Sequence, residues 1–297
     1  KTSFLVIAGI CIASVMYELV EGWISYSLAK VYHPDFKYWQ GVECAFYAAF
    51  YRVATLGSGA GVAAIYYFNE RGVPYSKGTG LYTIEYMLHK VSIALFAGIF
   101  FILNWGYMQK YYSQYDMTLL IGFGVTFVIA AVLLLFACSK KFHEVLLWIV
   151  RKLNRSGKLT EQVKKLEEQC AILEDAAATL LKRGGLIAGC ILKNLLKFTF
   201  WYGIPFLILA ETGKLTLSQG LAVTSLAMML AAVIPAPAGI GSSEFVLTML
   251  LAKIVGTGAA GSVALLYRFA TFVLPFVIGA VVVVLWRRVH RRTEKAA

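Results

Sequence analysis

Long apolar runs alternate with short polar stretches along most of the chain. A helix needs roughly 20 apolar residues to cross the hydrocarbon of a bilayer. Runs of about that length lie at 4–28, 81–103, 117–138, 186–210 and 262–286. Because each is predominantly apolar and ends in a polar link, each predicts a membrane-spanning helix. The pattern therefore predicts an all-α, polytopic integral membrane protein.

Two further apolar stretches, at about 38–68 and 217–255, contain residues that interrupt a helix. The breaks hold Gly57, Gly59 and Gly61 in the first stretch, and Pro235, Pro237, Gly239 and Gly241 in the second. Proline removes a backbone donor and clashes with the preceding turn. In hydrocarbon, broken backbone persists only where protein or a wet cavity surrounds it. We expect two re-entrant helix hairpins; a single kinked spanning helix without a ligand is the alternative for the second.

The residues directly after the second break suggest a site. Ser242, Ser243 and Glu244 are typical of the capped start of a new helix. The free amides and the positive dipole end of such a start attract anions. At membrane depth, this arrangement predicts binding of an anion such as a lipid phosphate.

Lysine and arginine counts predict the topology. Residues 139–183 hold ten basic residues and the tail at 287–292 is strongly basic, whereas 105–116 and 211–215 hold one each. The positive-inside rule places the basic segments, including the C-terminus, in the cytoplasm. The two hairpins then open to opposite faces, which is typical of an inverted repeat with a site at the midplane.

This topology divides the chain into three parts. Residues 1–138 form a first membrane repeat with its hairpin at about 38–68. Residues 139–183 form a cytoplasmic amphipathic helical segment. Residues 184–297 form a second membrane repeat, with its hairpin at about 217–255 and the basic cytoplasmic tail.

The cytoplasmic segment contains a heptad-like seam. Apolar residues recur at alternating steps of four and three, at Leu159, Val163, Leu166, Cys170, Leu173, Ala177 and Leu180. A dimerising coiled coil is one interpretation, and it would make the protein a homodimer. An amphipathic helix pair packed on the membrane body or its surface is the other. The short seam, poor in isoleucine, favours the second.

Composition agrees with this class and limits the partners. The chain is 59% hydrophobic, with a mean hydropathy of +0.70, and only 15% of its residues are charged. The net charge of +12 is explained by cytoplasmic loops that contact anionic lipid, so we expect no nucleic-acid partner. The five cysteines are odd in number and lie mostly in apolar runs, so neither a disulfide framework nor a metal site is predicted. No cofactor is expected.

Charged residues inside apolar runs are rare and costly, so they are candidate functional residues. The candidates for binding a lipid headgroup are Arg52, Glu85, Lys90, Ser242, Ser243, Glu244 and Arg268. Arginine suits phosphate through its planar fork, and a glutamate can pair with it or meet an amine. For each charge, a structural ion pair between helices is the alternative. Lys193 and Lys197 are expected to extend toward the inner headgroups.

The chain shows no signature of a known catalytic site. It has no HExxH motif, no nucleophile elbow and no P-loop. No catalytic residues are predicted, and a transporter is expected rather than an enzyme.

Several of these residues resemble one known family. The relevant stretches are 234–244 (IPAPAGIGSSE), 265–269 (LLYRF, with Arg268), 55–61 (TLGSGAG) and 66–72 (YYFNERG). They are similar to motifs of the flippase-like family formed by the membrane region of lysylphosphatidylglycerol synthase and of the multiple peptide resistance factor. Leu56 replaces a usual proline of these motifs, and Ala60 and Ala238 each replace a glycine.

The resemblance implies a function. It implies two inverted re-entrant hairpins, a further helix before Lys1, and a flippase that moves a phospholipid or an aminoacylated phospholipid between the leaflets of a bacterial cell membrane. Resistance to antimicrobial peptides is the associated role. A transporter of small polar solutes or ions is an alternative, as is a lipid-modifying membrane enzyme or its partner subunit. The soluble aminoacyltransferase domain of the full synthases is absent from this sequence, so synthase activity is not expected.

Overall fold

A computed structural model describes residues 3–113, 139–153, 160–234 and 236–296, together with 121–122, 124–125, 127–129, 131–132 and 135; the side chains of residues 153, 238 and 289–296 are not described. The described part of the chain is helical and contains no strand. Three of its helices are long and apolar enough to cross a membrane: Phe4–Ala29, Tyr75–Leu103 and Thr257–Arg288. The chain is therefore a helical membrane protein. The predicted span at 117–138 lies largely outside the described residues.

Residues 3–113 form five helices: α1 (Phe4–Ala29), α2 (Tyr38–Ala54), α3 (Ala60–Glu70), α4 (Tyr75–Leu103) and α5 (Trp105–Tyr112). The break between α2 and α3 lies where the glycines predict it. Leu56 and Gly57 have positive φ angles of 52° and 104°, and the Thr55 hydroxyl accepts a hydrogen bond from the Gly59 amide at 2.6 Å. After this turn, α3 packs against α2.

The second half begins with α9 (Gly184–Tyr202), α10 (Ile204–Leu209) and a 3₁₀ turn, η2 (Ala210–Thr212). It continues with α11 (Leu217–Ala231), the 3₁₀ turn η3 (Pro237–Gly239), α12 (Ser242–Val255) and α13 (Thr257–Arg268). A π-helical turn, η4 (Phe269–Val273), joins α13 to α14 (Leu274–Ala296). The second break also lies where the sequence predicts it, because Gly239 and Gly241 have φ angles of 67° and 84° that other residues rarely adopt.

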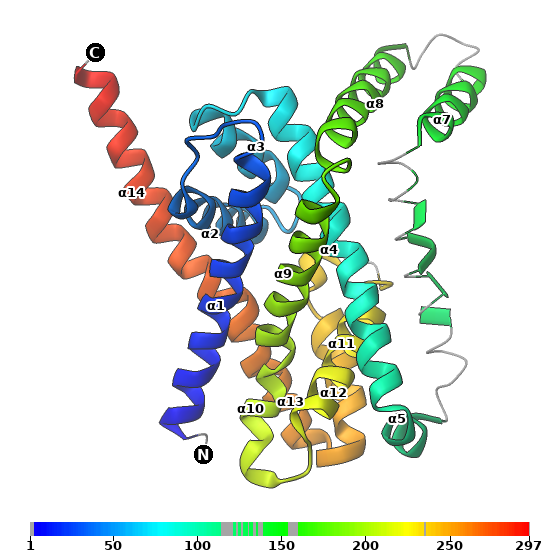
Figure 1. Cartoon of the computed structure of the whole chain (residues 1–297). Helices are drawn as coiled ribbons and strands as arrows, with labels where there is room; N and C mark the ends of the chain where they lie inside the picture. The colour runs from blue at the N-terminus through cyan, green and yellow to red at the C-terminus, as the bar shows by residue number, and fades with distance from the viewer. Residues whose placement is uncertain are drawn as a thin grey trace.

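The helices of the two halves pair in corresponding ways. α2 packs on α3 and α14, while α11 packs on α12 and α4. In Figure 1, α2 and α3 lie toward the end of the molecule that carries α8 and the C-terminus. α11, α12 and α13 lie toward the opposite end, with the N-terminus and α5. α11 and α12 pack against each other after the break, so residues 217–255 do not form one continuous straight helix.

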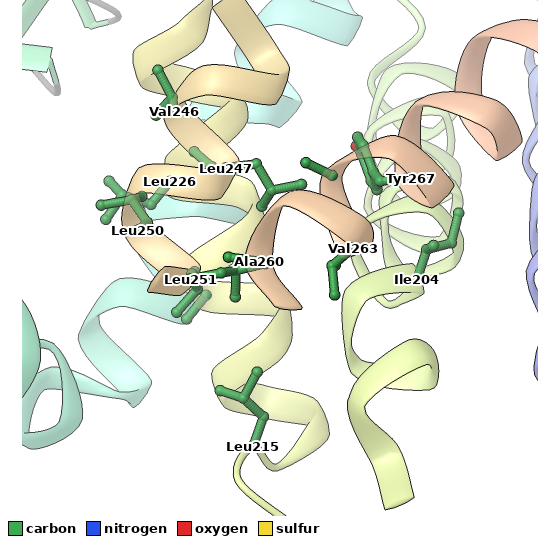
Figure 2. Close-up of a cluster of buried hydrophobic side chains, with 14 of the residues drawn as sticks. Ile204, Leu215, Leu226, Val246, Leu247, Leu250, Leu251, Ala260, Val263 and Tyr267 are labelled. Carbon is green, nitrogen blue, oxygen red and sulfur yellow. The ribbon is translucent and has the colours of Figure 1, made fainter. Parts of the chain in front are cut away.

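A large apolar cluster packs α10, α11, α12 and α13 together. Figure 2 shows ten of its side chains: Ile204, Leu215, Leu226, Val246, Leu247, Leu250, Leu251, Ala260, Val263 and Tyr267. The Tyr112 hydroxyl extends from α5 and donates to the Leu250 carbonyl at 3.0 Å. Inside a bilayer such contacts stabilise through van der Waals packing, since lipid tails are as apolar as leucine. The cluster therefore holds α12 and α13 in a fixed position relative to α11.

The segment between the halves contains α7 (Lys140–Leu153) and α8 (Thr160–Leu180). α8 packs on α4 and α7, and Val163, Cys170, Leu173 and Leu180 of the predicted seam are buried there. Leu159 lies outside the described residues. The seam is thus covered within the chain, as in the interpretation of a helix pair packed on the membrane body.

Close contact between α1 and α2 depends on two glycines. A Cβ at Gly22 would lie 2.5 Å from the Cα of Val42, and a Cβ at Gly41 would meet the carbonyl oxygen of Gly22. We expect Gly41→Ala to destabilise the protein by about 1–3 kcal/mol, because overpacking forces backbone shifts. The thermal unfolding midpoint in detergent measures this effect. Gly189→Ala is the control, since a Cβ there meets nothing within 4 Å; equal midpoints for the two variants would contradict the prediction.

Candidate functional site

Two neighbouring cavities share part of their lining: one lies within the first half of the chain, and the other lies between the two halves. The first, of about 190 Å³, is lined by residues of α1, α2, α3 and α4. The second, of about 290 Å³, reaches from α1, α2 and α4 to α9, α11, α12 and the α13–η4 region. Tyr17, Arg52 and His89 line both. The cavities therefore meet at these three side chains, next to the end of α2.

The first cavity is acidic and buried. Glu18, Glu21 and Glu85 line it together with Arg52. Glu18 is 1% exposed, and its Oε1 lies 3.6 Å from Nη2 of Arg52. Glu85 is also buried and accepts a hydrogen bond of 2.7 Å from the Ser25 hydroxyl. A buried charge is costly unless a partner compensates it. The cations that lie near these carboxylates therefore determine whether the carboxylates can stay ionised in this cavity.

Lys197 is the second cation of this cluster, and our expectation for it was wrong. The side chain does not extend toward the headgroups; the residue is 0% exposed. Its ammonium donates to Oε2 of Glu21 at 2.5 Å and contacts Nδ1 of His89 at 3.0 Å. A carboxylate within hydrogen-bond distance holds the ammonium more strongly than distant headgroups do. Lys193, one turn earlier, donates to the Ser27 hydroxyl at 2.6 Å and is partly buried.

Arg268, which lines the second cavity, forms an ion pair with Glu244. The Arg268 Nε lies 3.2 Å from Oε1 of Glu244, and its Nη1 lies 3.5 Å from the Ser243 hydroxyl. The guanidinium also stacks over the Phe272 ring, 3.7 Å from the centroid. Arg52 lines the same cavity, so two arginines from opposite halves of the chain face one space.

The start of α12 is locally organised around Glu244. Its Oε2 accepts a hydrogen bond from the Gly241 amide at 3.0 Å and lies 2.8 Å from the Ser243 hydroxyl. The hydroxyls of Ser242 and Ser243 lie 3.2 and 3.0 Å from the Gly239 carbonyl oxygen. The serines do not cap the helix by accepting amides, as the sequence suggests; Glu244 provides the cap. Ser242 and Ser243, the first two residues of α12, line the second cavity, so the N-terminal end of this helix, whose first amides lack helical acceptors, adjoins the cavity.

The structure brings most of the predicted site residues together. Arg52 and Glu85 line the first cavity; Arg52, Lys90, Ser242, Ser243 and Arg268 line the second. Glu244 pairs with Arg268 from behind. The ammonium of Lys90 lies 5.2 Å from the centroid of the Tyr86 ring.

The predicted break residues have different neighbours. Gly57 lines the first cavity and Gly239 the second. A Cβ at Gly61 would meet the Tyr82 ring, and one at Gly59 would meet Thr55. Pro237 begins η3 and Gly241 precedes α12. Pro235 lies outside the described residues.

Sequence reasoning missed several residues of the cluster. Glu18 and Glu21 are visible as charges in the first apolar run, but their partners Arg52 and Lys197 lie on other helices. Tyr17 was missed too, and its ring stacks on Trp201 with 3.4 Å between centroids. The sequence did contain a signal for this cluster. Because buried charges require partners, the acidic residues in one apolar run could have been matched with the basic residues in the others.

Comparisons with known proteins identify the family. No curated protein and no solved structure is significantly similar to the chain. The family described as the lysylphosphatidylglycerol synthase TM region matches residues 2–279. The match covers both breaks and the residues that line both cavities. The chain therefore belongs to the lysylphosphatidylglycerol synthase TM region family, a membrane family linked to lipids by its description.

Proposed function

We propose that this protein is a lipid flippase. It moves a phospholipid, or an aminoacylated phospholipid resembling lysylphosphatidylglycerol, between the leaflets of a bacterial cytoplasmic membrane. The observation that carries the proposal is the second cavity, where Arg52 and Arg268 from the two halves face one space beside the start of α12. Membership of a lipid-related membrane family supports it.

The chemistry of the second cavity suits a phosphate. Arg52 and Arg268 each present a planar fork of donors that matches phosphate oxygens. The amides at the start of α12 add partial positive charge. Glu244 pairs with the Arg268 guanidinium. An incoming phosphate competes with this carboxylate, so Glu244 sets the strength of phosphate binding.

Alternating access would come from the two helix–break–helix units. The corresponding pairings of α2–α3 and α11–α12 support an inverted repeat with two re-entrant hairpins. Each break adjoins a cavity, through Gly57 in the first unit and Gly239 in the second. Rocking one unit against the other opens the shared site to one leaflet at a time, while the acyl chains stay in lipid.

Lipid translocation in proteoliposomes tests the proposal. Fluorescent lipids with different headgroups are reconstituted with purified protein, and dithionite reports which leaflet they occupy. We expect faster movement that depends on the headgroup. No movement of any lipid by folded protein would overturn the proposal. Transport that a soluble headgroup analogue inhibits, but lipid does not, would favour a solute transporter, and new lipid products would favour an enzyme.

Labelling of single cysteines tests the proposed topology. In a background without the native cysteines, Glu211→Cys lies in the turn after α10 and Lys164→Cys lies on α8. We expect a membrane-impermeant maleimide to label the first in intact cells, and the second only after permeabilisation. The C-terminus and the basic face of α7 and α8 then lie in the cytoplasm, against anionic lipid. The reverse labelling pattern would contradict this orientation.

A further inference from the structure

The acidic groups of the first cavity outnumber the cations that contact them. Glu18, Glu21 and Glu85 contribute three carboxyl groups. Arg52 pairs with Glu18, and Lys197 pairs with Glu21. The Lys197 ammonium also donates to Nδ1 of His89, so that ring carries its proton on Nε2 and is neutral. One carboxyl group of the cluster therefore lacks a positive partner.

Glu85 is that carboxyl group. The contact that the structure gives it is the Ser25 hydroxyl, which donates to Oε1 at 2.7 Å. A neutral hydroxyl does not offset a full negative charge, and the residue is only 7% exposed. The titratable and charged groups around it are Glu21 from α1, Cys44 and Arg52 from α2, Lys197 and Cys190 from α9, and Tyr82, Tyr86 and His89 from α4 itself. The remaining excess charge is most simply neutralised by a proton.

A bound metal ion fits the surroundings of Glu85 less well than a proton does. Among the described residues, no group of three or more histidine, cysteine, aspartate or glutamate side chains is arranged to hold a metal ion. A proton needs only the free carboxyl oxygen, and the Ser25 hydroxyl can remain on the other oxygen. We propose that Glu85 binds an exchangeable proton, and that this proton accompanies the passage of an anionic lipid phosphate.

Arg52 couples proton binding in the first cavity to phosphate binding in the second. This side chain lines both cavities, and its contact with Oε1 of Glu18 is loose, at 3.6 Å and without a hydrogen bond. A phosphate bound between Arg52 and Arg268 draws the Arg52 charge away from the carboxylates. The cluster then holds a proton more strongly, so phosphate and proton bind together and leave together. One O–H bond forms on the carboxylate as the phosphate enters and breaks as it leaves.

Infrared spectroscopy of the purified, detergent-solubilised protein tests the proton site without lipid transport. We expect the carboxylic C=O region at neutral pH to contain a band that Glu85→Gln removes. Ser25→Ala retains the carboxyl but loses its hydrogen-bond donor, so we expect the same band at a higher frequency. Glu211→Gln, at an exposed turn, is the matched control and leaves the band unchanged. A spectrum that neither Glu85→Gln nor Ser25→Ala alters would overturn the proposal.

An imposed pH gradient tests the coupling, which rests on the proposed lipid transport. With the membrane voltage clamped, one proton per lipid shifts the steady-state leaflet ratio of the lipid about tenfold per pH unit. A leaflet ratio that does not respond to the gradient would overturn the coupling. If the wild-type protein moves no lipid, the flippase proposal fails, and the infrared bands still decide whether Glu85 holds a proton.

Discussion

We expect the variant Arg268→Ala to lose headgroup-dependent lipid movement. The Arg268 guanidinium contacts Glu244 and Ser243 at the start of α12 and lines the cavity that Arg52 shares. Truncating an arginine that pairs with a bound, desolvated phosphate costs about 2–5 kcal/mol, which corresponds to a loss of at least roughly 30-fold in phosphate binding. The initial rate of dithionite-resolved lipid movement, normalised to the amount of folded protein, measures this loss.

A surface arginine provides the matched control for this variant. Arg151 on α7 pairs with Glu167 on α8, and its side chain is 62% exposed. Exposed pairs of this kind contribute about 0–1 kcal/mol, so Arg151→Ala should transport lipid as the wild type does. Arg268→Lys retains the charge without the fork and should recover only part of the rate. Normal movement by Arg268→Ala would exclude the residue from the transport site.

Lys197→Met is expected to have the largest effect on stability. The variant keeps most of the side-chain volume but leaves Glu21 without its cation. Breaking a buried ion pair by removing one partner costs about 3–5 kcal/mol, because the remaining charge is uncompensated; since the Glu21 side chain is 26% exposed, we expect the lower end of this range. His89 also loses the ammonium that contacts Nδ1. Denaturant unfolding in detergent, followed by tryptophan fluorescence, measures the free energy of unfolding.

Two further variants separate charge from packing in this prediction. The double variant Glu21→Gln, Lys197→Met removes both charges and should recover most of the lost stability. Lys193→Met, in the same helix, should have a much smaller effect, because Lys193 contacts a neutral hydroxyl and the Trp23 ring. Equal stability of Lys197→Met and Lys193→Met would show that the Glu21 pair is unimportant.

Local signals in the sequence predicted most helices and both breaks. The first run was predicted at 4–28 and forms Phe4–Ala29, and α12 begins at Ser242 as expected. Proline and glycine act on the backbone within a few residues, so their positions are reliable. α4 was predicted to begin at residue 81 but begins at Tyr75. Its first turns pack on α8, where Lys77 pairs with Asp175, and a hydropathy pattern does not detect this tertiary contact.

The sequence was sufficient to pick out charged residues of the site, but not to predict which of them form ion pairs with each other. Arg52, Glu85 and Arg268 stand out because charges in apolar runs are rare. Their partners depend on which helices pack together, and Lys197 was misjudged for this reason. Its partner Glu21 lies 176 positions earlier in the chain, and α1 contacts α9 only in the assembled fold.

This separation in sequence has a consequence for biogenesis. A ribosome adds about 5–20 residues per second, so Lys197 is synthesised roughly 9–35 s after Glu21, given the 176 positions between them. During that interval α1 carries the Glu21 carboxyl group, while Lys197, its cationic partner, has not yet been synthesised. Centrally placed acidic residues cost up to about 3 kcal/mol each during insertion. The nascent first helix therefore needs a protonated side chain or a wet insertion site until α9 emerges and docks beside it.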